Sequence, residues 1–328
     1  MSQLRRNPLN CRWVNIAIDR SDRPGKLAIG RAPVEPEPIT PCPFCPGNEG
    51  AMPPALETYG PSGTWTVRVV PNDYPAFNGT RPFEINSIGP LFQQAPASGI
   101  HEVLVFSPNH EASWADLDDT AIAGVMAALR DRMEEHQSTP KVAYTQAIVN
   151  HGREAGASIE HPHGQLLGIP FVPSELTDEQ RGFADHGDDC LLCDTVETER
   201  AEGRRVVVET DRALVICPFW SGTPYELLVI PTNHAEGVAN AQPADVVAVG
   251  RALRDALAAL KRAVGDVAYN IVFHTSPHQD SGLFHWHAHV LPRITSVAGF
   301  EQGTGVLINI VAPEFATQQL LRAQERVK

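Results

Sequence analysis

The chain has 328 residues, the length of two ordinary domains or of one large domain. Hydrophobic residues make up 42% of it and charged residues 20%, with no apolar run long enough for a membrane span, so we expect a soluble globular protein. The net charge of −13 argues against duplex nucleic acid or an anionic membrane as a partner. No apolar secretion signal follows Arg5 and Arg6, so the expected location is the cytoplasm.

The first half of the chain predicts strands around one long helix. After a proline-rich stretch at 32–43, read as an extended loop, the β-rich runs cover 64–70, 101–106 and 141–149. Between the last two runs, apolar residues recur with helical spacing from Leu117 to Met133, which indicates an amphipathic helix.

The second half repeats this arrangement. Its β-rich runs cover 205–216, 225–230 and 267–273, and a helical apolar stripe extends from Val246 to Leu260. The proline-containing and charged stretch 170–189 is the expected connection. We therefore predict an α+β fold of two tandem domains, residues 1–172 and 173–328, with antiparallel sheets and packed helices.

Cysteines and histidines repeat in step with these elements. Six cysteines in a cytoplasmic protein favour metal or thiol chemistry over disulfides. Each of two C-x2-C pairs is followed by two histidines that stand 51 residues apart, which indicates an internal duplication. The two sets are Cys42, Cys45, His110, His161 and Cys190, Cys193, His234, His285.

Each set has the composition of a structural Cys2His2 zinc site, so the sequence predicts two zinc ions. The alternative for an isolated pair is a redox dithiol or two buried cysteines. Both zinc sites would close long loops and contribute to folding directly.

A further histidine lies close to the first set. His161 and His163 flank Pro162 and leave the same face of an extended strand, so one can bind metal while the other attacks phosphorus as a nucleophile. Gln165 lies on that same face and can donate to a phosphoryl oxygen, and Gly164 would let a substrate backbone approach. The alternative is that both histidines bind metal.

Residues 150–165, N-H-G-R-E-A-G-A-S-I-E-H-P-H-G-Q, resemble the active-site segment of galactose-1-phosphate uridylyltransferases, in the histidine triad superfamily. The resemblance implies that His163 forms a nucleotidyl-enzyme intermediate and that Gln165 holds the transferred phosphoryl group. It also implies structural zinc at the first Cys/His set. The implied substrate contacts are Asn150 and Ser158 for phosphate, Arg20 and Arg23 for the diphosphate or sugar phosphate, and Asn72 and Asp73 for ribose.

The second half resembles the plant-type ADP-glucose phosphorylase branch of the same superfamily, which has two zinc sites. In the enterobacterial uridylyltransferases a carboxylate and histidines hold the second metal, and His274, His287 and His289 are the alternative ligands for zinc or iron here. Phe300 and Glu301 stand where that family binds the hexose, without the preceding Lys and Phe, so a galactose 1-phosphate acceptor is not assured.

The predicted function is transfer of a nucleotidyl group between a nucleotide sugar and a sugar 1-phosphate, with one nucleophile per chain. UMP is the nucleotidyl group that the resemblance favours. The alternative within the superfamily is an ADP-glucose phosphorylase that uses inorganic phosphate. A hydrolase and a zinc-stabilised binding module are further alternatives. The expected partners are these small substrates, and the chain is a monomer or a homodimer.

Overall fold

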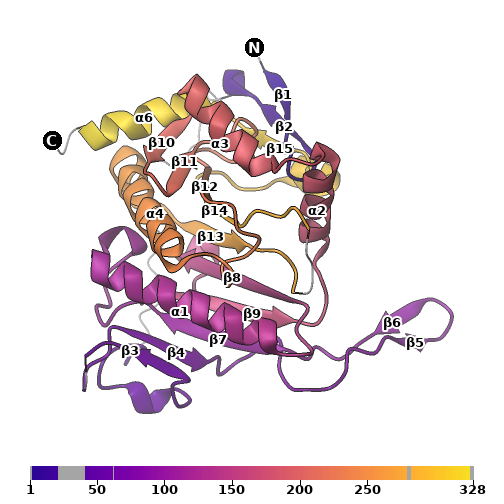
Figure 1. Cartoon of the computed structure of the whole chain (residues 1–328), viewed down its shortest axis with the longest axis vertical. Coiled ribbons are helices and arrows are strands. Elements are labelled where there is room, and N and C mark those ends of the chain that lie inside the picture. The colour runs from indigo at the N-terminus through magenta and orange to yellow at the C-terminus, as the bar shows by residue number, and fades with distance from the viewer. Residues whose placement is uncertain (1, 21–40, 62, 279–281, 326–328) are drawn as a thin grey trace.

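The computed structural model describes residues 2–20, 41–61, 63–278 and 282–325, and it is built around one large antiparallel sheet (Figure 1). Within these residues the sheet has ten strands. In order across the sheet they are β10 (Val206–Glu209), β11 (Ala213–Ile216), β12 (Leu227–Pro231), β14 (His287–Pro292), β13 (Tyr269–His274), β8 (Tyr144–His151), β9 (His163–Ile169), β7 (Ile100–Val105), β4 (Val67–Pro71) and β3 (Glu57–Tyr59). Every β-rich run of the sequence contains one or two of these strands, so the α+β prediction with antiparallel sheets is confirmed.

The centre of the sheet is the pairing of β8 with β13, where the two halves of the chain meet. The strands of each half lie on their own side of this pairing and follow the same order. Ile148 pairs with Val272 there, and these two residues are 124 positions apart in the sequence. His161 and His285, at matching places in the two Cys/His sets, have the same separation. This repeat about a local two-fold axis agrees with a duplication. Because one sheet runs through both halves, their division into residues 1–172 and 173–328 stays a prediction.

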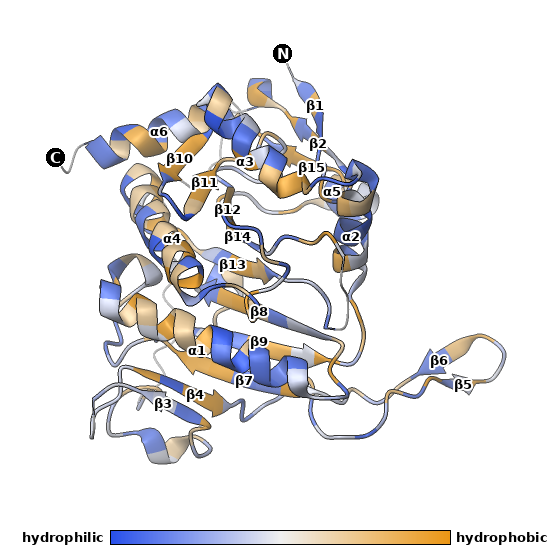
Figure 2. Cartoon of the chain, viewed as in Figure 1, coloured by the Kyte–Doolittle hydropathy of each residue, from blue (hydrophilic) through white to orange (hydrophobic). Residues whose placement is uncertain are grey.

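Two long helices cover one face of the sheet, as the apolar spacing predicts. α1 (Asp119–Ser138) begins where the Asp118 carboxylate accepts a hydrogen bond from the Ala121 N–H at 2.7 Å, and α4 (Pro243–Val264) begins with a proline, which needs no N–H partner. The stripe residues within the helices are buried: Ile122, Val125, Met126, Leu129, Met133, Val246, Val249, Leu253, Leu257 and Leu260. Figure 2 shows the polar character of the last turns of α1, which lie above apolar strands.

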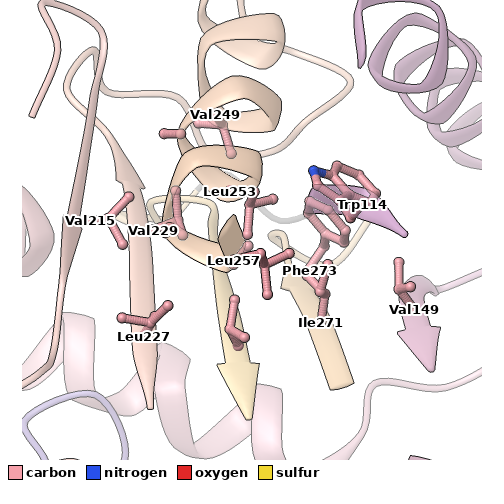
Figure 3. Packing of buried hydrophobic residues seen from close by; sticks show 14 of the residues in the cluster. Trp114, Val149, Val215, Leu227, Val229, Val249, Leu253, Leu257, Ile271 and Phe273 are labelled. Carbon is pink, nitrogen blue, oxygen red and sulfur yellow. The ribbon is translucent and has the colours of Figure 1, made fainter. Parts of the chain in front are cut away.

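The core under these helices joins the two halves of the chain. Figure 3 shows Leu253 and Leu257 of α4 among strand residues such as Ile271. Trp114, in the short 3-10 helix η3 (Trp114–Asp116), donates its indole N–H to the Gly250 carbonyl at 3.1 Å. Burying each large aliphatic side chain contributes about 1.5 to 3 kcal/mol, so this layer holds the central strands in place.

Helices also cover the opposite face of the sheet. Over its second half, α2 (Ser174–His186) and α3 (Leu191–Glu202) share a core with β11 and β12. The remaining elements are a small sheet of β1 (Gln3–Arg6), β2 (Trp13–Ile16) and β15 (Leu307–Asn309), the hairpin of β5 (Asn86–Ile88) and β6 (Phe92–Gln94), the helices α5 (Gly299–Thr304) and α6 (Pro313–Glu325), and the 3-10 turns η1 (Ile18–Arg20), η2 (Glu49–Ala51) and η4 (Arg153–Ala155). No helix in the described ranges is both long and apolar enough to cross a membrane.

The stretch 170–189, expected to be only a connection, contains α2. Leu176 and Phe183 of this helix are buried in the second core. Gly182 lies against the backbone of the N-terminal segment so closely that a Cβ there would overlap the Leu9 carbonyl oxygen. The glycine therefore sets how closely α2 approaches the rest of the protein.

Gly182→Ala tests this contact. The added methyl group meets backbone rather than a movable side chain, so α2 must shift, and we expect a loss of about 1 to 3 kcal/mol in the free energy of unfolding. Gly50→Ala is the matched control, because a Cβ at Gly50 meets nothing within 4 Å. Denaturant unfolding measures both variants, and equal stabilities would show that α2 is not held by this approach.

Candidate active site

His163 and Gln165 lie on the face of β9 that points away from α1. Side chains alternate along a strand, and Leu166 packs into the core under α1 while His163 and Gln165 take the other face. Gly164 also points toward that core, where a Cβ would come within 2.9 Å of the Phe106 ring. The prediction that Gly164 admits a substrate backbone is therefore wrong, because the glycine makes room for Phe106.

One ring nitrogen of His163 is occupied by the protein itself. Nδ1 lies 2.8 Å from the His161 carbonyl oxygen, and since a carbonyl only accepts, Nδ1 carries the proton and Nε2 keeps its lone pair. Phe44, from the first C-x2-C turn, packs on the ring with a centroid distance of 5.2 Å. Burial lowers the pKa of His163, so its neutral and nucleophilic form is favoured.

The structure brings the first Cys/His set together, with the ligand atoms of all four residues within 4.8 Å of one another. Cys45 Sγ lies 3.3 Å from His110 Nδ1 and 3.6 Å from His161 Nδ1. His161 Nε2 donates to the Ser107 carbonyl at 2.7 Å, which leaves Nδ1 free as a ligand. Burial lowers the pKa of His161 to about 4, so the ring is neutral. This donor set fits a tetrahedral metal ion.

The second Cys/His set has the same form. Its four ligand atoms also lie within 4.8 Å of one another, and His285 Nδ1 is 3.4 Å from Cys190 Sγ and 3.5 Å from Cys193 Sγ. His285 Nε2 lies 3.0 Å from the Pro231 carbonyl, the counterpart of the contact between His161 and Ser107. Cys190 immediately precedes α3, so this set fixes the start of that helix.

A third group of ligands stands apart from these two sets. Its members are Glu179, His274, His287 and His289, all buried and with ligand atoms within 4.8 Å of one another. The three histidines, considered as alternatives to the second Cys pair, therefore form a separate site with a carboxylate. His287 Nε2 and His289 Nε2 have no hydrogen-bond partner in the part of the chain that the structure describes, so the group fits a cation.

Sequence reasoning missed Glu179. It lies three residues after Leu176 and four before Phe183, which is the spacing of one helix face, and this pattern could have placed it on the buried side of α2. His274 Nδ1 lies 2.9 Å from its carboxylate. Burial alone would raise the pKa of Glu179, but the histidines around it lower that pKa well below its usual range.

The third group occupies the place in the second half that His163 occupies in the first. The spacing that relates His161 to His285 also relates His163 to His287 and Gln165 to His289. His287 Nδ1 lies 2.8 Å from the carbonyl oxygen of His285, two residues earlier, as His163 Nδ1 does from that of His161. Glu179 of α2 lies at this second position, with a carboxylate oxygen 3.7 Å from His287 Nε2.

The substrate-binding residues implied by the resemblance differ in their burial and in their contacts. Asn150 of β8 adjoins β9, and its Oδ1 accepts a hydrogen bond from Asn270 Nδ2 at 2.7 Å, across the junction of the two halves. Asn72 Nδ2 lies 3.1 Å from His101 Nε2, and this ring nitrogen lies 2.8 Å from Gln165 Oε1. Asp73, Ser158 and Arg20 are exposed, whereas Arg23 lies outside the described residues.

Phe300 and Glu301 are not brought to His163 within the described structure. They belong to α5, which Figure 2 shows beside α2 and apart from β9. Phe300 is exposed, and the Glu301 carboxylate accepts a hydrogen bond from the Ala298 N–H at 3.1 Å, which caps its own helix.

Comparisons with known proteins identify the family. Residues 1–173 match the sequence model of the galactose-1-phosphate uridyl transferase N-terminal domain, and residues 112–328 match that of a domain of unknown function (DUF4921). An ADP-glucose phosphorylase from Arabidopsis thaliana is 31% identical over 326 residues, which are 95% of this chain and 90% of that protein. A galactose-1-phosphate uridylyltransferase from Thermotoga maritima is 27% identical over the whole of both chains.

Solved structures give the same result. The crystal structure of an ADP-glucose phosphorylase from Arabidopsis thaliana with bound ADP-glucose has a TM-score of 0.83 at 27% identity, over 98% of this chain and 99% of that one. A uridylyltransferase structure has a TM-score of 0.77 at 25% identity, over the whole of both chains. The chain therefore belongs to the galactose-1-phosphate uridylyltransferase family of enzymes and also resembles ADP-glucose phosphorylase.

Proposed function

We propose that the protein transfers a nucleotidyl group from a nucleotide sugar to a phosphate-bearing acceptor through a covalent bond to His163. The observation that carries this proposal is the contact of His163 Nδ1 with the His161 carbonyl at 2.8 Å, which leaves Nε2 as the free nucleophile. Gln165 on the same face is the candidate donor to a phosphoryl oxygen.

In the first step His163 Nε2 forms a bond to the α-phosphorus, and the bond from this phosphorus to the leaving oxygen breaks. The sugar 1-phosphate departs with that electron pair, so no proton has to be supplied to it. The imidazole gains positive charge, which the His161 carbonyl stabilises through Nδ1–H. In the second step a phosphate oxygen of the acceptor attacks the same phosphorus and releases Nε2.

Two substrate pairs fit this chemistry. The first is UDP-glucose with a hexose 1-phosphate, as the similarity to several galactose-1-phosphate uridylyltransferases suggests. The second is ADP-glucose with inorganic phosphate. The 31% identity to the plant ADP-glucose phosphorylase and the second Cys/His set favour this pair.

The nucleophile is tested by mass spectrometry of the intact protein after mixing with UDP-glucose or ADP-glucose. We expect one nucleotidyl group per chain in the wild type and none in His163→Ala, because His287, which repeats the Nδ1 contact of His163, has its Nε2 3.7 Å from the Glu179 carboxylate. His186→Ala, an exposed histidine on α2, is the matched control and should be labelled normally. Labelling of His163→Ala at the wild-type level would exclude the proposed mechanism.

The acceptor is tested by adding a hexose 1-phosphate or inorganic phosphate to the labelled enzyme. Uptake of UMP and its transfer to the hexose 1-phosphate would establish the first pair. Uptake of AMP and release of ADP with inorganic phosphate would establish the second. Release of free mononucleotide into water with neither acceptor required would instead identify a hydrolase and contradict both pairs.

We further propose that the two Cys/His sets hold structural zinc. All four positions of each set come from protein, so no position is open for a reacting water. The third group, with one carboxylate and three imidazoles, would take Fe²⁺ or Zn²⁺. A bound ion there would tie α2 to β13 and β14.

Metal analysis of purified variants tests these assignments. Cys190→Ser should lose about one zinc per chain, because a set of three ligands binds the ion far more weakly. Glu179→Gln should lose only the ion of the third group. Cys11→Ser, which alters a cysteine outside all three groups, is the matched control. An unchanged zinc content in Cys190→Ser would refute the second zinc site.

The remaining assignments belong to the same proposal. The proposed substrate contacts are Asn150 and Ser158 for phosphate, Asn72 and Asp73 for ribose, Arg20 and Arg23 for the diphosphate or sugar phosphate, and Phe300 and Glu301 for the sugar. A duplicated two-domain chain, a cytoplasmic location and a monomeric or homodimeric state complete it.

A further inference from the structure

His101 of β7 connects two parts of the candidate site. It pairs with Leu167 of β9, so Gln165 is its diagonal neighbour on the face away from α1. Its carbonyl accepts a hydrogen bond from the Asn72 N–H at 2.9 Å, and its ring Nδ1 lies 3.0 Å from the Ala76 backbone nitrogen. The ring thus lies between the segment 72–76 and Gln165.

The Ala76 contact determines where the proton of the His101 ring resides. A backbone N–H can only donate, so Nδ1 must accept and the neutral ring carries its proton on Nε2. Nε2 lies 2.8 Å from Gln165 Oε1, and this oxygen is therefore the acceptor of the Nε2 proton.

Asn72 does not compete for this proton. Its Oδ1 accepts a hydrogen bond from the Tyr74 N–H at 2.8 Å, which turns its amide nitrogen toward His101, 3.1 Å from Nε2. The Asn72 side chain therefore offers no acceptor to His101. With Nε2 protonated, its amide nitrogen makes no hydrogen bond to the ring, and Gln165 Oε1 is the partner of Nε2–H.

With Oε1 engaged, the Gln165 amide has one orientation. Its NH2 group has no hydrogen-bond partner within the described part of the chain. Gln165 and His163 are two positions apart on one strand face, about 7 Å along the strand. A phosphoryl group bound to His163 Nε2 would lie beside this strand face, where the two N–H donors of the amide are available.

We propose that His101 is a positioning residue that holds the Gln165 amide with its NH2 toward the transferred phosphoryl group. This inference rests on the proposed nucleotidyl transfer at His163. His101 touches neither the reacting atoms nor the leaving group, so it acts through Gln165. It also links the segment of the proposed ribose contact to the phosphoryl site, because the backbone of Ala76 sets the tautomer that Gln165 requires.

Two substitutions separate the contacts of His101. An asparagine amide reaches the position of Nδ1, so His101→Asn can accept from the Ala76 N–H but loses the donor to Gln165. A glutamine amide reaches the position of Nε2, so His101→Gln keeps that donor. We expect the rate constant of nucleotidyl-enzyme formation to fall about tenfold to 100-fold in His101→Asn and to recover largely in His101→Gln, with the KM for the nucleotide sugar changed much less.

A double variant of His101 and Gln165 distinguishes this positioning role from a purely structural one. If His101 acts through Gln165, adding His101→Asn to Gln165→Ala should slow nucleotidyl-enzyme formation little further. Multiplicative losses in the double variant, or equal losses in His101→Asn and His101→Gln at matched thermal stability, would overturn the proposal. Absence of any labelled wild-type enzyme would instead refute the proposed function, so the two failures are distinguishable.

Discussion

The hydrogen bond between His163 Nδ1 and the His161 carbonyl is the contact on which the site depends. It leaves a single nitrogen for chemistry and directs that nitrogen away from the backbone. The same short segment places the His161 ring in the first Cys/His set. A metal ion held there would therefore fix the carbonyl that orients the proposed nucleophile, without itself taking part in bond making.

The two halves of the chain use one geometry for two purposes. His287 repeats the contact of His163 with the carbonyl two residues before it, but His289 replaces Gln165, and the Glu179 carboxylate lies among these histidines. The proposed reaction site of the first half thus corresponds to a group of candidate metal ligands in the second. On one side of the local two-fold axis this position holds the proposed nucleophile, and on the other it holds histidines that contact Glu179 of α2.

Local patterns explain what the sequence could predict. A C-x2-C turn brings two thiolates together by itself, and equal histidine spacings require equal strand connections, so both Cys/His sets could be inferred from the order of residues alone. The helical stripes from Ile122 to Met133 and from Val246 to Leu260 depend only on a period of 3.6 residues. Strands β9 and β14 lie outside the predicted β-rich runs, because they begin with His-Gly-Gln and His-Ala-His in place of β-branched residues, although an extended strand was expected from His161 to Gln165.

Other features depend on long-range packing. Glu179 meets His274 across 95 positions of sequence, and the tautomer of His101 depends on the backbone N–H of Ala76. The most direct test of the account is a crystal structure of the covalent intermediate, trapped with nucleotide sugar and without acceptor. It should show phosphorus bonded to His163 Nε2, with a non-bridging oxygen near the Gln165 NH2 group. A bond to Nδ1 or to another residue would contradict the account.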